Sequence, residues 1–280
     1  MMSADMDDLL EREMEVARRI QTSFLPEEMP QFPGWEIAAR FQPARHVAGD
    51  FYDAFPLVQN RRLALVMGDV CDKGVGAALF MALFRTLIRA FAQQHYALRW
   101  MNDFSVERLA RSVDGERPVL PSVGTSALRN AMELTNEYIV NNHGSSGMFA
   151  TLFIGVLDPT SGMLLFANGG HEYPILVSSA GVTTQLDTTG PLVGVFPGAQ
   201  FEIQSATIEL GDTLVAFTDG ITEARNSRDE FFGRERLYAL MERPVSTAAE
   251  LLDRIQASVQ EHMGGADPSD DITLLAVRRQ

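Results

Sequence analysis

Short apolar segments joined by tight turns dominate the second half of the chain and constrain its fold most. Segments 149–157, 163–167, 174–178, 183–186, 201–205 and 213–217 have the length and residue types of strands. The first two are separated by Asp158-Pro159-Thr160-Ser161-Gly162, a turn sequence. Links this short join antiparallel neighbours, because a parallel crossover needs a dozen or more residues. The chain is therefore expected to form mainly antiparallel sheet, closed by a last strand over 272–277.

Helical periodicity marks five further segments, 5–24, 77–93, 126–142, 233–241 and 247–262. Residues 63–67 form a continuous apolar run, as in a strand buried on both faces. Many strands with helices in pairs predict an α+β fold, a layered α-β-β-α sandwich. Strands do not alternate with helices and no glycine-rich phosphate loop is present, so a Rossmann arrangement is disfavoured.

The stretch from about residue 95 to residue 125 is less regular. It contains Asp114-Gly115, Pro118 and Pro121, which predict a loop-rich insertion with one short helix. A flap over a binding site and a surface for a partner are both open hypotheses for it.

Charge and cysteine content narrow the function classes. The formal net charge of −14 disfavours nucleic acid as a partner, because phosphate backbones are bound by Lys and Arg. The single cysteine, Cys71, excludes a disulfide within the chain and is compatible with the cytoplasm. The acidic N-terminus is unlike a signal peptide, and no apolar run approaches the roughly 20 residues of a membrane helix, so no membrane contact is expected.

Four acidic residues lie beside strands that must be buried. Asp50 precedes a strand, Asp69 ends the run 63–67, Asp219 follows 213–217, and Asp270 with Asp271 precedes the last strand. Isolated carboxylates there would carry a large desolvation penalty, whereas Mg²⁺ and Mn²⁺ prefer carboxylate, carbonyl and water oxygens. Each acid alone also fits a turn, since Asp beside Gly is a common turn dipeptide. Both interpretations stay open on these residues alone.

The motifs around these acids resemble a known family. They are Gly49-Asp50-Phe51-Tyr52-Asp53, the stretch from Gly68-Asp69-Val70 to Met81, Ala167-Asn168-Gly169-Gly170-His171-Glu172-Tyr173-Pro174, Thr218-Asp219-Gly220-Ile221-Thr222-Glu223-Ala224, Phe232-Gly233 with Arg236-Leu237, and Asp270-Asp271-Ile272-Thr273. Together they resemble, in order, the SpoIIE/RsbU branch of the metal-dependent type 2C (PPM) protein serine/threonine phosphatases. That resemblance implies a central antiparallel β-sandwich flanked by helices.

The resemblance also implies a mechanism and roles. A metal-bound water would attack the phosphorus directly, with two Mn²⁺ or Mg²⁺ ions as cofactors. Asp69 would bridge both ions with the Val70 carbonyl as a further ligand, Asp50 would complete the second site, and Asp219 and Asp270 would hold the first ion. Asp271, Lys73, Gly220 and His171 are accessory candidates, with Asp271 the less favoured ligand of its pair.

Several residues keep two interpretations each. Lys73, which departs from the frequent family sequence, fits a solvated lysine or a group that orients substrate phosphate. His171 fits a turn between strands or a general acid near the site. No phosphate-binding arginine can be assigned, although Arg40 and Arg45 are candidates. Cys71 need not be a nucleophile and suits a packing role.

The resemblance extends to organisation and partners. Residues 1–30 would form an amphipathic linker helix, through which the chain could dimerise or receive a signal from an upstream sensory or receiver domain, and 31–280 would form the phosphatase domain. The expected substrate is a phosphoserine or phosphothreonine on a cytoplasmic signalling protein, typically an anti-sigma-factor antagonist in bacterial partner switching. A non-catalytic partner-binding module of the same fold and a hydrolase of another phosphoester are the alternatives.

Overall fold

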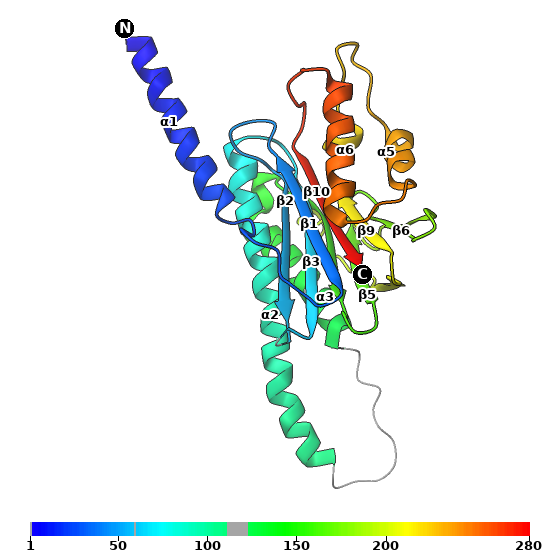
Figure 1. The fold of residues 1–280 in the computed structure, drawn as a ribbon. Coiled ribbons are helices and arrows are strands. Elements are labelled where there is room, and N and C mark those ends of the chain that lie inside the picture. The colour runs from blue at the N-terminus through cyan, green and yellow to red at the C-terminus, as the bar shows by residue number, and fades with distance from the viewer. Residues whose placement is uncertain (1, 59, 111–122) are drawn as a thin grey trace.

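Two antiparallel sheets packed face to face form the centre of the molecule, with helices on their outer faces (Figure 1). This is a computed structural model that describes residues 2–58, 60–110 and 123–280. Sheet A has the order β1 (Trp35–Gln42), β10 (Ile272–Arg279), β9 (Thr213–Phe217), β6 (Ile175–Val177) and β7 (Thr183–Gln185). Sheet B has the order β2 (Phe51–Leu57), β3 (Arg62–Val70), β4 (Ala150–Leu157), β5 (Met163–Gly169) and β8 (Gln204–Thr207).

The helices cover the two sheets from opposite sides. Helices α2 (Val75–Ala110) and α3 (Val123–His143) pack on sheet B, while α6 (Ala248–Met263) packs on sheet A beside α5 (Arg234–Met241). The short helices η1 (Gly144–Ser146) and α4 (Asp219–Thr222) lie at strand ends. The N-terminal helix α1 (Met2–Thr22) projects from the body of the molecule (Figure 1). The expected α-β-β-α sandwich is confirmed.

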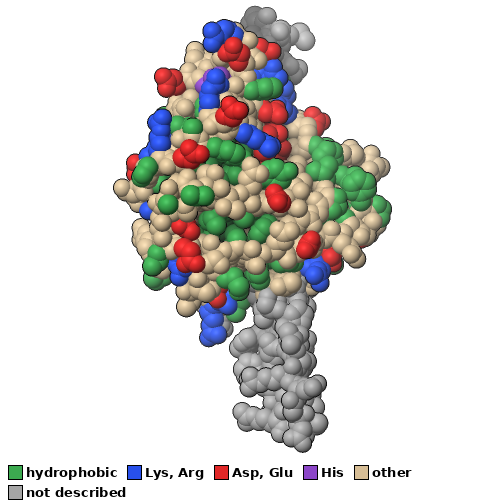
Figure 2. All heavy atoms as spheres, turned by 90° about the vertical axis from the view of Figure 1, so that its right-hand side faces the viewer, with side chains coloured by type: hydrophobic (Ala, Val, Ile, Leu, Met, Phe, Trp, Pro, Cys, Tyr) green, Lys and Arg blue, Asp and Glu red, His purple; other side chains and the backbone are tan. Residues whose placement is uncertain are grey.

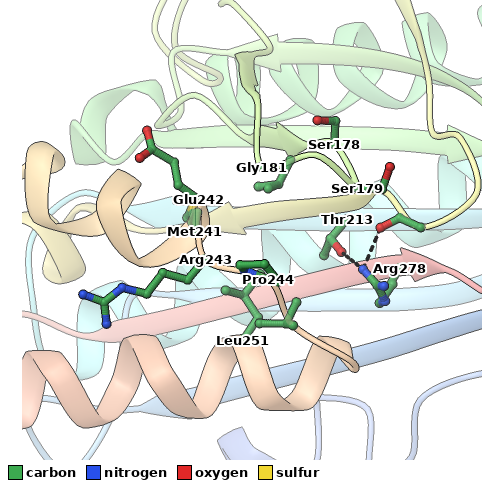
Figure 3. Close-up of a pocket in the computed structure, with 13 residues that line it drawn as sticks. Ser178, Ser179, Gly181, Thr213, Met241, Glu242, Arg243, Pro244, Leu251 and Arg278 are labelled. Atoms are coloured by element: carbon green, nitrogen blue, oxygen red, sulfur yellow. Dashed lines mark hydrogen bonds between the residues drawn. The ribbon is translucent and has the colours of Figure 1, made fainter.

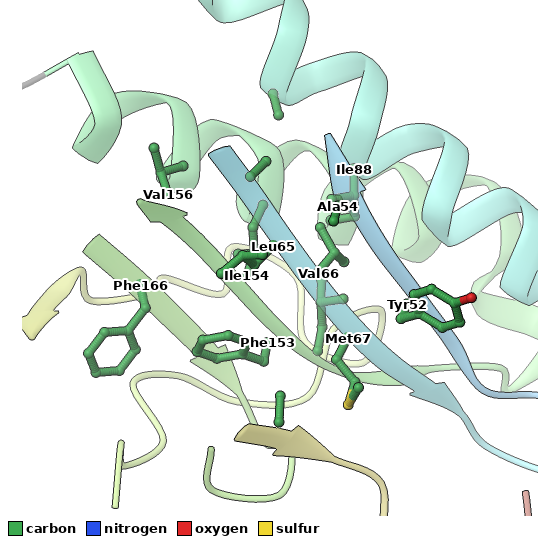
Figure 4. Close-up of a cluster of buried hydrophobic side chains, with 14 of the residues drawn as sticks. Tyr52, Ala54, Leu65, Val66, Met67, Ile88, Phe153, Ile154, Val156 and Phe166 are labelled. Carbon is green, nitrogen blue, oxygen red and sulfur yellow. The ribbon is translucent and has the colours of Figure 1, made fainter. Parts of the chain in front are cut away.

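The core is built from apolar side chains on both faces of the strands, because successive side chains of a strand point to opposite faces of the sheet. In sheet B, Phe153 and Phe166 lie on the face toward sheet A, and Ile154 and Val156 lie on the face toward the helices (Figure 4). Side chains from both sheets, including Leu65 in β3, belong to one buried cluster. This continuous core fixes how the sheets pack, and with them the strand ends that carry the acids.

Helix α6 shows how local sequence sets an element boundary. The Thr247 side chain accepts a hydrogen bond from the Glu250 backbone N–H at 3.0 Å, and Gly264 ends the helix with a φ of 59°. Glu36 of β1 accepts hydrogen bonds from the first two helical N–H groups, those of Ala248 and Ala249. The helix start is therefore fixed to the edge strand of sheet A.

One expected element was wrong. Residues 95–110 are not a loop, because α2 continues as a helix through Ala110. The segment contains Ala, Leu, Arg, Met and Glu, which are strong helix formers, and the nearest glycine or proline comes only at Gly115. Residues 111–122 lie outside the described residues, so the function of that segment stays a prediction.

Helix α2 also corrects the expectation that no apolar run reaches membrane-spanning length. Its segment Val75–Gln93 is long and apolar enough by length and composition, with a mean hydropathy of 1.6. One face of this segment is buried, with Ala77, Met81, Phe84 and Ile88 spaced three or four residues apart. Since this face packs on sheet B, α2 acts as a core helix of the fold, and core helices of soluble proteins pass the same test.

Candidate functional site

Strand register places Asp50 beside Asp69. Strands β2 and β3 are antiparallel, and Phe51 pairs with Gly68. Asp50 precedes Phe51 and Asp69 follows Gly68, so the two acids extend the same pair of neighbouring strands at one end of sheet B. The two motifs are separated by a hairpin in the sequence and are brought together by its register.

Strand register in sheet A does the same for Asp219 and Asp270. Phe217 pairs with Leu274, and the Thr218 N–H donates to the Thr273 carbonyl at 3.1 Å. The end of β9 therefore lies beside the start of β10. Asp219 begins α4, the four-residue helix that directly follows β9, so its carboxylate stays at this end of the sandwich.

Two threonine hydroxyls join Asp50 to sheet A. Asp50 Oδ2 accepts hydrogen bonds from Thr218 Oγ1 at 2.7 Å and from Thr273 Oγ1 at 2.6 Å. Asp50 is 2 % exposed, so these bonds replace the water that a carboxylate needs. The two sheets are thus connected by polar contacts at the end where the acids lie. The sequence motifs contained both threonines, but their partner in the other sheet is evident only in the folded chain.

The acids act on one another electrostatically. Burial, with the carboxylates of Asp219 and Asp270, raises the pKa of Asp69 to about 7. Burial and the Asp270 carboxylate raise the pKa of Asp219 to about 6, and burial, Asp69 and Asp271 raise the pKa of Asp50 well above its ordinary value. Carboxylates from four separate strand ends therefore converge in a poorly solvated place, and a bound cation relieves this kind of repulsion.

Two glycines allow the backbone to approach closely at this site. A Cβ on Gly49 would lie 2.7 Å from the Val70 carbonyl oxygen, and a Cβ on Gly220 would overlap the Asp271 carbonyl. Any side chain at either position would push these segments apart. Gly220, an accessory candidate, thus lets α4 lie against the segment that carries Asp270, and Gly49 leaves room for the Val70 carbonyl.

The neighbouring acids Asp270 and Asp271 have different surroundings. Asp271 Oδ1 accepts from the Ala44 N–H at 2.7 Å, and Oδ2 accepts from the Gly49 N–H at 2.8 Å. Its carboxylate is used to hold the segment that leads into Asp50. Asp270 is one-third exposed, and its Oδ2 is paired with the Lys73 ammonium. The choice of Asp270 rather than Asp271 as a metal ligand stays a prediction, and Asp271 has the structural role of binding the Ala44 and Gly49 N–H groups.

The donor set suits a hard divalent cation in type, because it consists of carboxylates with a backbone carbonyl beside them. Within residues 2–58, 60–110 and 123–280, however, no three His, Cys, Asp or Glu side chains are already gathered as a group that could hold a metal ion. Asp50 Oδ2 is bound by two hydroxyls, and Asp270 Oδ2 is bound by the Lys73 ammonium. A cation that binds Asp270 Oδ2 would have to displace the Lys73 ammonium, whereas Asp50 Oδ1 is not bound by these two hydroxyls.

His171 lies in a closed turn. Its N–H donates to Asn168 Oδ1 at 2.8 Å, and Asn168 Nδ2 donates to the His171 carbonyl at 3.2 Å. The ring is buried and its Nδ1 contacts the Thr151 hydroxyl at 2.8 Å, while its Nε2 lacks a hydrogen bond of good geometry despite a backbone contact to Phe217. Burial lowers the pKa of His171 to about 4, so the ring is neutral near pH 7. Of the two interpretations of His171, this geometry fits the turn between strands rather than the general acid.

The remaining candidates are placed as follows. Arg40 binds Asp253 of α6 at 2.6 Å, which directs its guanidinium away from the acids. Arg45 is exposed and follows Ala44, whose N–H binds Asp271. The Cys71 sulfur accepts from the Phe149 N–H at 3.2 Å, and burial raises the pKa of its thiol, which suits packing rather than nucleophilic attack.

Sequence reasoning assigned no role to Gln21. Its side chain forms two hydrogen bonds with the Ala48 backbone, as donor to the carbonyl at 2.7 Å and as acceptor from the N–H at 2.9 Å. This contact ties the end of α1 to the segment that precedes Asp50. A glutamine at the end of an amphipathic helix carries no sequence signal for a partner 27 residues away.

A small hollow lies at the opposite end of sheet A (Figure 3). It has a volume of about 60 Å³ and is lined by Ser178, Thr213, Met241, Arg278 and their neighbours. Thr213 begins β9, whereas Asp219 follows its end. Arg278 donates to the Gly211 carbonyl and the Thr213 hydroxyl, so its charge is used within the protein. This hollow is separate from the cluster of Asp50, Asp69, Asp219 and Asp270, which we call the acid site.

The surface in Figure 2 shows acidic and basic side chains interspersed, with hydrophobic side chains scattered between them. The described residues of this face form no continuous basic tract of the kind that follows a phosphate backbone.

Comparison with known proteins decides the family. The family model described as Stage II sporulation protein E (SpoIIE) matches residues 59–280, which is most of the chain. The chain belongs to the SpoIIE family. Protein IcfG of Synechocystis is 44% identical over 268 residues, with 95% of this chain and 41% of that protein covered. The phosphoserine phosphatase RsbU of Bacillus subtilis is 25% identical over 273 residues, with 97% of this chain and 71% of that protein covered. The chain thus spans less than half of the first relative.

Solved structures agree on the fold of this SpoIIE-family chain. The SiaA-PP2C domain of Pseudomonas aeruginosa superposes with a TM-score of 0.75 at 18% identity, covering 99% of this chain and all of that one. RsbX in complex with magnesium superposes with a TM-score of 0.57 at 15% identity, covering 90% of this chain and 99% of that one. The chain is thus a SpoIIE-family chain with the fold of these PP2C-type domains.

Proposed function

We propose that this SpoIIE-family domain is a metal-dependent protein phosphatase that hydrolyses phosphoserine or phosphothreonine on a signalling partner. The observation that carries the proposal is the convergence of Asp69, Asp219 and Asp270 from β3, the end of β9 and the start of β10. Burial and the carboxylates of Asp219 and Asp270 raise the pKa of Asp69, and burial and the Asp270 carboxylate raise the pKa of Asp219. Carboxylates that lie close together at strand ends are suited to binding divalent cations, because hard cations prefer oxygen ligands.

The residues would divide the work of holding two ions, Mn²⁺ or Mg²⁺. Asp69 would contact both, with the Val70 carbonyl beside it, Asp219 and Asp270 would complete the first site, and Asp50 the second. When bound, the ions would supply an activated water and positive charge for the phosphoryl oxygens. That one relative was solved with magnesium supports a metal of this type.

Other residues of the chain would keep this site in shape. Thr218 and Thr273 orient the Asp50 carboxylate by donating to Oδ2, which leaves Oδ1 free of these two hydroxyls. Asp271 holds the Ala44 and Gly49 N–H groups and so fixes the chain that enters β2. His171 is neutral and buried, so it acts through the turn it forms rather than as a proton donor to the leaving group.

The substrate class is inferred from relatives. RsbU and RsbP of Bacillus subtilis are both named phosphoserine phosphatases. An anti-sigma-factor antagonist in the cytoplasm, with regulation of a sigma factor by partner switching, remains the proposed setting. Helix α1, which carries exposed Leu9, Leu10 and Ile20, remains the proposed linker through which an upstream domain or a second copy would act.

The first test is hydrolysis of a phosphoserine protein and of p-nitrophenyl phosphate, with and without Mn²⁺. The wild type should turn over only with metal, and Asp219→Asn should lose at least about 100-fold, the scale on which removing one charge-stabilising group acts. Asp229→Asn is the matched control, because Asp229 is an exposed acid ten residues further on that pairs only with Arg225 among the described residues.

Each outcome separates the proposed function from its alternatives. Metal-independent turnover that is equal in all variants would refute the mechanism. Turnover of p-nitrophenyl phosphate with none on any phosphoprotein would favour a hydrolase of another phosphoester. Metal binding by the wild type with no turnover on either substrate would favour a non-catalytic module.

A further inference from the structure

Lys73 is the single lysine of the chain, since the other 22 basic residues are arginines. It lies in the loop between β3 and α2, four residues after Asp69. A protein that uses arginine for every other cationic position places its one compact ammonium at the acid site. Arginine and lysine are not equivalent there, because the ammonium is a point charge with three donors and the guanidinium is a broad planar fork.

The loop backbone aims Lys73 across the site. Asp72 and Gly74, on either side of it, have φ angles of 71° and 85°, and the Lys73 N–H donates to Asp72 Oδ1 at 2.8 Å. The Lys73 ammonium then reaches the segment before β10, where it donates to the Ser269 carbonyl at 2.6 Å and binds Asp270 Oδ2 at 2.8 Å. One side chain thus joins the segment after Asp69 to the segment that carries Asp270.

Both oxygens of Asp270 are engaged in this arrangement. Oδ1 accepts from the Asp271 N–H at 2.9 Å, and Oδ2 is held by Lys73. The ammonium therefore occupies the carboxylate oxygen of Asp270 that the backbone does not bind, so a cation coordinated there would compete with Lys73. Lys73 and Asp270 are each about one-third exposed, so water can replace either partner without opening the core.

We propose that Lys73 is a built-in counter-cation of the acid site, which holds Asp270 until a divalent cation displaces it. The inference rests on the proposed function, since it assumes that Asp270 is a metal ligand. The Lys73 ammonium binds Asp270 Oδ2 at 2.8 Å, so a cation that uses this oxygen must displace it. Lys73 would thereby lower the apparent metal affinity and keep the two loops together before the ion binds.

Calorimetric titration with Mn²⁺ tests the competition without relying on activity. Lys73→Met removes the ammonium and should bind Mn²⁺ about 10-fold more tightly, about 1.4 kcal/mol. Lys73→Arg keeps a cation and should show no such gain. Arg225→Gln is the matched control, because it also removes one positive charge, six residues after Asp219 in the sequence, but this charge contacts Asp229 rather than Asp270. Its Mn²⁺ affinity should stay within about 2-fold of the wild type.

Acylation of amines in the wild type gives an independent measurement. The chain has two kinds of amine, the N-terminus and Lys73, so peptide mass spectrometry can follow Lys73 with the N-terminus as internal reference. Saturating Mg²⁺ should raise the acylation of Lys73 relative to the N-terminus several-fold, because the ion pair is released. Asp270→Asn should show the raised value without metal.

The outcomes separate this inference from the proposed function. Mn²⁺ binding that is equally tight in wild type, Lys73→Met and Arg225→Gln, with an acylation ratio unchanged by Mg²⁺, overturns the role of Lys73 and leaves the metal site standing. If neither the wild type nor Lys73→Met binds Mn²⁺, both the role of Lys73 and the proposed metal site are overturned. An equal gain in Mn²⁺ affinity in Lys73→Met and Arg225→Gln would show a general effect of net charge, and it would also overturn the specific role of Lys73.

Discussion

The Gln21 side chain pairs with both backbone groups of Ala48, at 2.7 Å and 2.9 Å. This is the same two-bond pattern that a neighbouring strand would offer, supplied here by a helix. Both residues are buried, and Ala48 is two residues before Asp50. The position of α1 is therefore coupled to the segment that carries a candidate ligand.

Replacing Gln21 with Ala should lower the free energy of unfolding by about 1–3 kcal/mol, because two buried backbone groups of Ala48 lose their partner. Urea denaturation measures the loss. Gln31→Ala is the matched control, since the Gln31 side chain bonds only its near neighbour Met29 at an exposed position, and it should change stability by less than about 0.5 kcal/mol. Equal stability of the two variants would refute the coupling.

Asp270 and Asp271 should respond differently to the same change. Asp271→Asn should lower the free energy of unfolding by about 1–3 kcal/mol, because the new amide NH₂ would face a backbone N–H of Ala44 or Gly49. Asp270→Asn should retain near-wild-type stability but lose Mn²⁺ affinity by at least about 10-fold. Thermal unfolding and calorimetric Mn²⁺ titration of both variants measure the contrast, and the reversed pattern would exchange the two roles.

His171 should make the protein less stable as the pH falls. Its pKa is lowered to about 4 in the folded protein and is about 6.5 when unfolded, so the unfolded state alone takes up a proton between these values. The contribution to stability is present in full above pH 6.5 and is lost progressively toward pH 4. Between pH 7.5 and pH 5.0 the loss should be about 2 kcal/mol.

The measurement compares urea unfolding of wild type and His171→Gln at the two pH values, because the carboxylates titrate in both proteins and cancel. His46→Gln, at an exposed position, should keep the wild-type dependence. A pH dependence in His171→Gln as steep as in the wild type would show that His171 does not stay neutral in the fold.

The buried Asp53 should be a large contributor to stability. Its carboxylate, 1% exposed, binds Arg85 at 3.0 Å and Arg89 at 2.9 Å, and so attaches α2 to β2. Asp53→Ala should lower the free energy of unfolding by about 3–5 kcal/mol, because Arg85 is left in a poorly solvated place without a counter-ion.

Arg89→Met should cost less, about 1 kcal/mol, because Arg89 is 35% exposed and Arg85 still pairs with Asp53. Chemical denaturation of both variants tests the asymmetry. A larger loss for Arg89→Met than for Asp53→Ala would contradict this account of the cluster.

Much of the fold was predictable because its signals are local. The turn at 158–162, the apolar run of 149–157 and the periodicity of 247–262 are local signals, and they indicate strand and helix without reference to the rest of the chain. The exception, 95–110, shows the limit of this reasoning. The less regular pattern together with Asp114-Gly115, Pro118 and Pro121 predicted a loop, whereas the helix formers of 95–110 continue α2.

The sequence by itself determined which acids are the candidate cation ligands, since Asp50, Asp69, Asp219 and Asp270 each adjoin an apolar strand. Only the tertiary structure decided how each is used. Asp50 is oriented by hydroxyls from the other sheet, and Asp270 is held by Lys73 from 197 residues earlier in the chain. Side-chain contacts of this kind depend on strand register and sheet packing, which are set by the whole core and leave no mark on the local sequence.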